Sequence, residues 1–87
     1  MKTLSWNVRG CNVPDKIQLI KRCLDQTKSD LVLLQETKIK MEDFVVFKKK
    51  FRRWECLFSG AHGASGGMAI LWKPDIIEIT DFVLENN

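Results

Sequence analysis

The sequence Leu31-Val32-Leu33-Leu34 is a short, unbroken apolar run that follows Ser29-Asp30 and precedes Gln35-Glu36. Runs of this length without a polar interruption are typical of β-strands that are covered on both faces. A strand is therefore predicted at residues 31–34. The polar pair Gln35-Glu36 stands directly after its carboxyl end.

Upstream of this run, the sequence alternates and then changes to helical spacing. Residues 2–8 alternate between apolar and polar side chains, which predicts a second strand. After a loop rich in turn residues, apolar residues recur at intervals of three and four. This spacing predicts an amphipathic helix from Asp15, as its N-cap, to about Thr27. Strand, helix and buried strand form a βαβ-like unit, or a variant with a different pairing.

Downstream, three phenylalanines within residues 44–51 have helical spacing and predict a second helix with basic residues on its other side. Alternating apolar residues then predict three further strands, around 54–58, 68–72 and 77–83. The expected fold class is α/β, with about five strands and two helices. Helices that cover one face of a sheet leave the other face in need of a second layer, and no further element is predicted to supply it.

Composition limits the class of protein. Of the 87 residues, 45% are apolar and 29% are charged, as expected for one ordinary soluble domain. The longest apolar run, around 68–72, is far shorter than the ~18 residues that span a bilayer, so no membrane protein is expected. The N-terminus lacks the apolar core of a secretory signal, which favours an intracellular protein. Three cysteines without C-x-x-C spacing predict free thiols.

Positive charge is concentrated in residues 48–53, which carry a charge of +5. The net charge of the whole chain is +3, so the remaining residues together carry −2. A cluster of this kind attracts nucleic-acid phosphates, because their neutralisation releases condensed counterions. A run this short is more commonly the solvated end of a helix, where cations complement the macrodipole. The basic residues are Lys48, Lys49, Lys50, Arg52 and Arg53.

Two polar residues stand at the carboxyl ends of strands that otherwise read as buried, Asn7 and Glu36. If the two strands are parallel neighbours, the carboxamide and the carboxylate face one crevice, where open α/β sheets place their ligands. Hard oxygen donors of this kind suit Mg²⁺, which keeps most of its waters. The alternative is that Glu36 is a loop carboxylate and Asn7 a turn former.

Other chemical motifs are weaker. The only histidine, His62, lies in a Gly/Ala stretch and is expected at the surface. Ser65-Gly66-Gly67 precedes a predicted strand and lacks the Lys-Ser/Thr ending of a phosphate loop, so a turn is predicted there. No arrangement of Ser, Cys and His for nucleophilic catalysis is found.

Three motifs together resemble the endonuclease/exonuclease/phosphatase superfamily, the DNase I-like proteins. The likeness runs from residue 1 almost to residue 87 and is closest to the N-terminal endonuclease domain of plant LINE-type non-LTR retrotransposons. Three motifs in this order are much more specific than any one of them. They are Ser5-Trp6-Asn7-Val8-Arg9-Gly10 with Asn12, Asp30-Leu31-Val32-Leu33-Leu34-Gln35-Glu36-Thr37-Lys38, and Gly63-Ala64-Ser65-Gly66-Gly67-Met68-Ala69-Ile70-Leu71-Trp72.

The resemblance implies a four-layer α/β sandwich and cleavage of phosphate esters with Mg²⁺ or Mn²⁺. It implies that Glu36 is the metal ligand and that Asn7 helps to organise the metal and the scissile phosphate. Arg9 and Asn12, in the first motif, are candidate nucleic-acid contacts. Arg9 also stands where abasic-site endonucleases have Asp, which favours the retroelement branch. The implied partner is DNA and the implied compartment the nucleus, otherwise the cytoplasm; the oligomeric state stays open.

The resemblance also places a Tyr, an Asp-x-Asn pair and an Asp-His pair downstream of the matched motifs, and this sequence has no Tyr. Residues 1–87 are therefore expected to form the N-terminal part of a DNase I-like domain, with half of a metal site and without activity alone. Two alternatives stay open. One is a small nucleic-acid-binding module that uses residues 48–53, and the other is a non-functional retroelement remnant.

Overall fold

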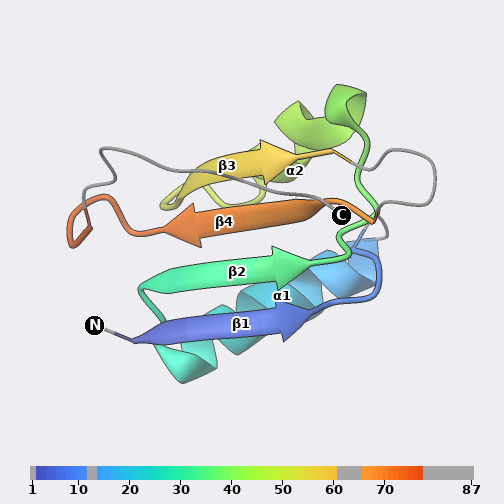
Figure 1. The fold of residues 1–87 in the computed structure, drawn as a ribbon. Helices are drawn as coiled ribbons and strands as arrows, with labels where there is room; N and C mark the ends of the chain where they lie inside the picture. Colours follow the sequence, from blue (N-terminus) through green and yellow to red (C-terminus); the bar gives the residue numbers. More distant parts are fainter. Residues whose placement is uncertain (1, 12–13, 61–65, 78–87) are drawn as a thin grey trace.

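The described part of the chain forms one mixed β-sheet with two α-helices, as Figure 1 shows. The structure is a computed structural model and describes residues 2–11, 14–60 and 66–77. In chain order the elements are β1 Thr3–Asn7, α1 Pro14–Thr27, β2 Leu31–Gln35, the 3₁₀ helix η1 Met41–Asp43, α2 Phe44–Lys49, β3 Glu55–Ser59 and β4 Met68–Trp72. The predicted α/β fold class is confirmed.

The order of strands in the sheet is β1-β2-β4-β3. β1 and β2 are parallel, with α1 as the crossover, so the predicted βαβ unit is present. β4 runs antiparallel to both β2 and β3. β1, β2 and β3 therefore end at the same edge, which we call the carboxyl edge, formed by the register row Asn7, Gln35, Met68 and Ser59. The opposite row, which we call the amino edge, is Thr3, Leu31, Trp72 and Glu55.

The core lies between one face of the sheet and the helices. Four inward side chains of β2 and β4 are completely inaccessible to solvent. Against them pack Ile20 and Leu24 of α1 and Phe47 of α2. Full burial of one such aliphatic side chain contributes about 1.5–3 kcal/mol. The four inward residues of the sheet are Val32, Leu34, Ala69 and Leu71.

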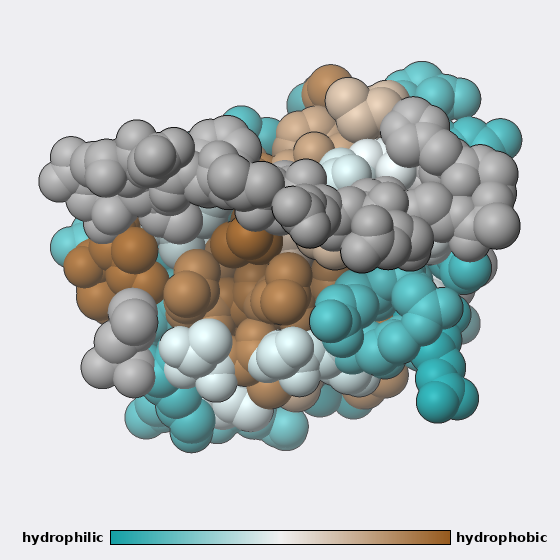
Figure 2. Space-filling model, in the orientation of Figure 1, coloured by the Kyte–Doolittle hydropathy of each residue, from teal (hydrophilic) through white to brown (hydrophobic). Residues whose placement is uncertain are grey.

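The other face of the sheet is only partly covered. Leu31 and Leu33 of β2 and Ile70 and Trp72 of β4 are half-buried, and Figure 2 shows apolar side chains gathered over these two strands. Among the described elements, both helices pack on one face of the sheet, because the buried residues of α1 and α2 belong to the same core, as the sequence predicted. The need for a second layer follows from this exposed apolar face.

The helix boundaries differ from the predicted ones in two places. α1 begins at Pro14, so Asp15 lies in the first turn and is not the N-cap. Proline favours the first position of a helix and a carboxylate in the first turn complements the macrodipole, which explains the sequence there. α2 ends at Lys49, and Phe51, predicted within the helix, lies beyond it. Phe51 is nevertheless buried, with its ring 4.9 Å from that of Phe47.

The last predicted strand, around 77–83, lies outside the described residues from residue 78 onward, and Ile77 is not in a strand. The described part of the chain therefore holds four strands. None of its helices is long and apolar enough to cross a membrane.

Candidate metal centre

The site is built on two loops that leave β1 and β2 at the carboxyl edge. The loops run side by side, because the backbone N–H of Gly10 donates to the carbonyl of Glu36 at 2.6 Å and that of Cys11 to the carbonyl of Thr37 at 2.8 Å. The pairing of the two parallel strands therefore continues beyond their ends. It fixes the backbone on which the polar side chains stand.

Both loops contain residues in the left-handed backbone region. Arg9, Glu36 and Lys38 have φ of 52°, 53° and 60°, and they are three of the four non-glycine residues with positive φ in the described chain. This conformation costs about 1–2 kcal/mol per residue, because Cβ approaches the following carbonyl. Residues held in this way cluster at functional sites, where surrounding bonds maintain them. The backbone thus sets the direction of the Glu36 side chain.

A third segment, just before β4, closes against Glu36. The backbone N–H of Lys38 donates to the carbonyl of Gly66 at 2.7 Å, and that of Thr37 to the carbonyl of Gly67 at 3.2 Å. A Cβ at Gly66 would lie 3.0 Å from Cγ and 3.1 Å from Cα of Glu36, closer than side chains pack. Gly67 has φ of 79°, which favours glycine. The predicted turn at these glycines therefore also supports Glu36.

The side chains of Asn7 and Glu36 meet at this edge. The Asn7 amide Nδ2 donates to the Glu36 carboxylate Oε2, while Asn7 Oδ1 accepts the backbone N–H of Arg9 at 3.1 Å. Both groups of the Asn7 side chain are thus engaged, and the amide is held in one orientation. The structure brings together the two residues that sequence analysis placed at neighbouring strand ends.

The chemistry of this pair fits a hard divalent cation. Glu36 is exposed, and its Oε1 has no hydrogen-bond partner among the described residues. Mg²⁺ binds through one or two carboxylates and keeps several waters, so one carboxylate held by an amide suits it. Within residues 2–11, 14–60 and 66–77 no group of three or more His, Cys, Asp and Glu side chains is placed to hold a metal. Any cation here would depend on Glu36.

The interior beside the pair is inert. Thr37 is fully buried, and its hydroxyl Oγ1 has no hydrogen-bond partner among the described residues. The Cys11 thiol donates to the carbonyl of Thr37 at 3.4 Å. Burial raises the pKa of Cys11 to about 12, against a smaller lowering by the charge of Lys16. Cys11 is therefore a protonated thiol that supports the loop, not a nucleophile.

The other predicted site residues fall into three groups. Arg9 is exposed beside the pair, and Asn12 and His62 lie outside the described residues. The basic residues lie in the last turn of α2 and in the segment that leads to β3, and none of them takes part in the side-chain hydrogen bonds of Asn7 and Glu36. Only Lys48 and Lys49 belong to the helix, and the other three, Lys50, Arg52 and Arg53, follow it.

Sequence reasoning missed two contributors. The close contact between Gly66 and Glu36 joins residues far apart in the chain, and the glycine pair before β4 was its only local signal. Lys21 of α1 lies beside the basic segment across a pocket. Its helical position gave no indication of this neighbour, because the contact depends on how α1 packs.

The hydrogen-bonded pair Asn7 and Glu36 therefore lies at the carboxyl ends of parallel strands, where open α/β sheets bind their ligands. The model of the endonuclease/exonuclease/phosphatase family matches residues 4–86. The chain therefore belongs to this family, and its sheet and helices are consistent with part of a DNase I-like domain. No match was found among the curated proteins.

Membership of this family makes the chain a nuclease- or phosphatase-type domain. The family is generally metal-dependent and acts on nucleic acids, which is compatible with a DNA substrate. The predicted superfamily is confirmed. The likeness to plant LINE elements stays a prediction.

Proposed function

We propose that this chain provides the metal-binding part of a Mg²⁺-dependent endonuclease site that nicks DNA. The observation that carries the proposal is the hydrogen bond between Asn7 and Glu36 at the carboxyl edge. It lies where open α/β sheets bind ligands, and the residues around it belong to a family that acts on phosphate esters.

The two residues have different roles in this proposal. Glu36 is the metal ligand, through the carboxylate oxygen that Asn7 leaves free. Asn7 is a positioning residue, since its amide holds the carboxylate and is itself held by the Arg9 backbone. Mg²⁺, or Mn²⁺ in its place, would act as a Lewis acid and template at the phosphate. The exposed Arg9 stands where its charge would attract the DNA backbone.

We further propose that residues 1–87 are the first part of a larger four-layer domain of retroelement type, active in the nucleus. The half-buried apolar face of the sheet supports this, because such a face requires a second layer. Among the described residues no group of three or more His, Cys, Asp and Glu side chains is placed to hold a metal, which is consistent with a site that needs further residues for activity. Reading the source locus downstream should reveal Asp-x-Asn and Asp-His motifs, and unrelated sequence there would contradict the proposal.

Mn²⁺ binding tests the site without requiring activity. Electron paramagnetic resonance of free Mn²⁺, titrated with the 87-residue chain, should show binding that Mg²⁺ displaces. Glu36→Ala should abolish it, whereas Glu42→Ala, which removes an exposed carboxylate from η1, should not. Equal binding by both variants would overturn the assignment of Glu36.

Nicking of supercoiled plasmid tests the reaction. The chain alone should leave the plasmid intact in Mg²⁺. A parallel sample in EDTA shows the amount of nicking without free metal. Nicking that requires both Mg²⁺ and Glu36 would contradict inactivity while supporting the site. A folded chain that neither nicks nor binds Mn²⁺ would favour the alternative of a non-functional remnant.

A further inference from the structure

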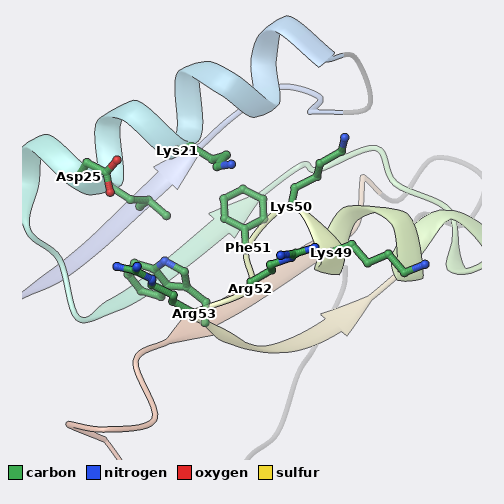
Figure 3. Close-up of a pocket in the computed structure, with 9 residues that line it drawn as sticks. Lys21, Asp25, Lys49, Lys50, Phe51, Arg52 and Arg53 are labelled. Atoms are coloured by element: carbon green, nitrogen blue, oxygen red, sulfur yellow. The ribbon is translucent and has the colours of Figure 1, made fainter.

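A pocket of about 410 Å³ lies on the helical side of the molecule, between α1 and the segment that joins α2 to β3 (Figure 3). From α1 it is lined by Lys21, Leu24 and Asp25. From the joining segment it is lined by residues 49–54. Two elements far apart in the sequence therefore form one hollow.

The charge of this pocket is strongly positive. Five cationic side chains line it against one carboxylate, Asp25. None of the five cations forms an ion pair within 4 Å with any described residue, and Asp25 is not such a partner either. Four of them are exposed and Lys21 is partly buried. The lining cations are Lys21, Lys49, Lys50, Arg52 and Arg53.

A second hollow of about 490 Å³ continues the first across the same segment. The two share Lys49, Phe51, Arg52 and Trp54, and the second adds the cation Lys48 and the carboxylate Glu55. We call the two hollows together the basic groove. Because they adjoin along one segment, the groove accommodates an extended anion better than a compact one.

The floor of the groove is firmly held. Phe51 is only 3% exposed, and its ring packs on Phe47. Backbone bonds of 3.0 Å from Lys50 to Phe47 and from Trp54 to Phe51 fix the segment in tight turns. Nζ of Lys73 lies 5.3 Å from the centre of the Trp54 ring and adds positive charge at this end. The cations thus extend from a rigid base.

We propose that the basic groove binds the phosphate backbone of a nucleic-acid strand, independently of the Asn7–Glu36 pair. Closely spaced lysines and arginines without counter-ions gain affinity from phosphates through counterion release. Cationic side chains that line adjoining hollows can follow one backbone of a duplex, where phosphate contacts supply affinity that does not depend on sequence. Residues 52–54 precede β3 at the amino edge, so a strand bound there lies away from Glu36.

Anisotropy of a short fluorescein-labelled DNA duplex, measured in EDTA, tests the groove separately from metal chemistry. The triple variant Lys21→Gln, Arg52→Gln, Arg53→Gln should bind ~10-fold or more weakly at low salt. The slope of log affinity against log salt should flatten by about 0.9 for each phosphate that the variant no longer neutralises. A matched triple, Lys2→Gln, Lys28→Gln, Lys40→Gln, removes the same charge from exposed lysines outside the groove. It should bind within about threefold of wild type.

Three further arms make the outcome decisive. Arg52→Lys with Arg53→Lys should retain most of the affinity, and circular dichroism should show the same fold for every variant. Glu36→Ala should leave duplex binding unchanged. The proposal for the groove and the proposal for the endonuclease site can therefore be contradicted separately. Equal losses of affinity in the two triples would overturn the groove as a site. Binding to phosphatidylserine vesicles in preference to DNA would overturn nucleic acid as its ligand.

Discussion

The two polar regions of the molecule hold their side chains in different ways. At the carboxyl edge, backbone hydrogen bonds, left-handed residues and a close glycine set the position of Glu36. In the basic groove, cations extend into solvent from a fixed floor, without ion pairs to described residues. A metal ligand requires placement within about 0.5 Å, whereas attraction of phosphates requires mainly charge density. Backbone changes should therefore damage the first region, and charge changes the second.

The largest effect is expected where both regions depend on the same support. Leu34 lies fully buried in β2, near the middle of the sheet. Leu34→Ala should lower the free energy of unfolding by about 2–5 kcal/mol, because it leaves a cavity. A domain with a total stability of about 5–15 kcal/mol would then lose both metal and DNA binding on mild heating. Urea unfolding followed by circular dichroism measures the decrease.

Leu33→Ala is the matched control, since Leu33 is the preceding residue and lies half-buried on the other face. It should cost less than half as much, because less apolar area becomes exposed to water. Equal costs would show that the outward face is as tightly packed as the inward one.

A change at Gly66 should affect one region alone. Gly66→Ala would place Cβ 3.1 Å from the Glu36 backbone, which cannot move without breaking its bond from Gly10. A decrease of about 1–3 kcal/mol in the free energy of unfolding is expected from the overpacking, together with loss of Mn²⁺ binding. DNA binding in EDTA should be unchanged.

Gly60→Ala offers a comparison with the same chemistry. Its Cβ would lie 2.8 Å from Cγ and 3.1 Å from Sδ of Met41, whose exposed side chain can turn away, and 3.3 Å from the Met41 backbone N. The cost should be smaller than at Gly66, and Mn²⁺ binding should persist. If both variants lose Mn²⁺, the contact with Glu36 is not what holds the site.

Asn7→Ala sharpens the comparison further, because it keeps the backbone and removes the bond to the carboxylate. Removal of a group that orients a metal ligand typically costs ~10–100-fold in metal affinity. Stability should fall by only about 0.5–1.5 kcal/mol, as for one hydrogen bond. Ser5→Ala, an exposed position on the same strand, should change neither quantity. Unchanged Mn²⁺ affinity in Asn7→Ala would remove Asn7 from the site.

Sequence periodicity predicted most of the fold, because each element carries its own local pattern. β1, α1, β2, β3 and β4 lie where alternation or helical spacing placed them. The end of α2 was missed, because Phe51 keeps the helical spacing while its burial comes from the turn that follows. The burial of only one face of β2 by described residues agrees with the expectation that the other face needs a second layer.

The meeting of Asn7 and Glu36 was predictable because strand ends follow from strand direction. The backbone and glycine contacts that hold these two side chains in place were not predictable from the sequence. The positive φ angles of Arg9 and Glu36 cannot be read from the sequence, because arginine and glutamate usually avoid this backbone conformation. The approach of Gly66 to Glu36, and of Lys21 to the basic segment, arises only when distant segments pack together.

A change of pH should affect both regions, because each of them lies near a buried thiol. Cys11 lies beside Glu36, and Cys56 lies in β3, two residues after Trp54 of the groove. Burial raises the pKa of each thiol from 9.0 to about 12, opposed by the charges of Lys16 and Lys48 respectively. Between these values the folded chain retains protons that the unfolded chain releases. The free energy of unfolding should therefore fall as the pH rises above 9.

The slope should be at most about 1.4 kcal/mol per pH unit for each thiol. The chain has no tyrosine that could titrate in this range. Urea unfolding in reducing buffer from about pH 8 to about pH 10 measures the slope, and Cys11→Ala with Cys56→Ala should flatten it. Cys23→Ala, at a less buried thiol, serves as the control and should keep the wild-type slope. If one buried cysteine alone carries the slope, only the region beside it is closed to solvent in the folded chain. That result would show whether the region around Cys11 or the region around Cys56 opens more readily to solvent.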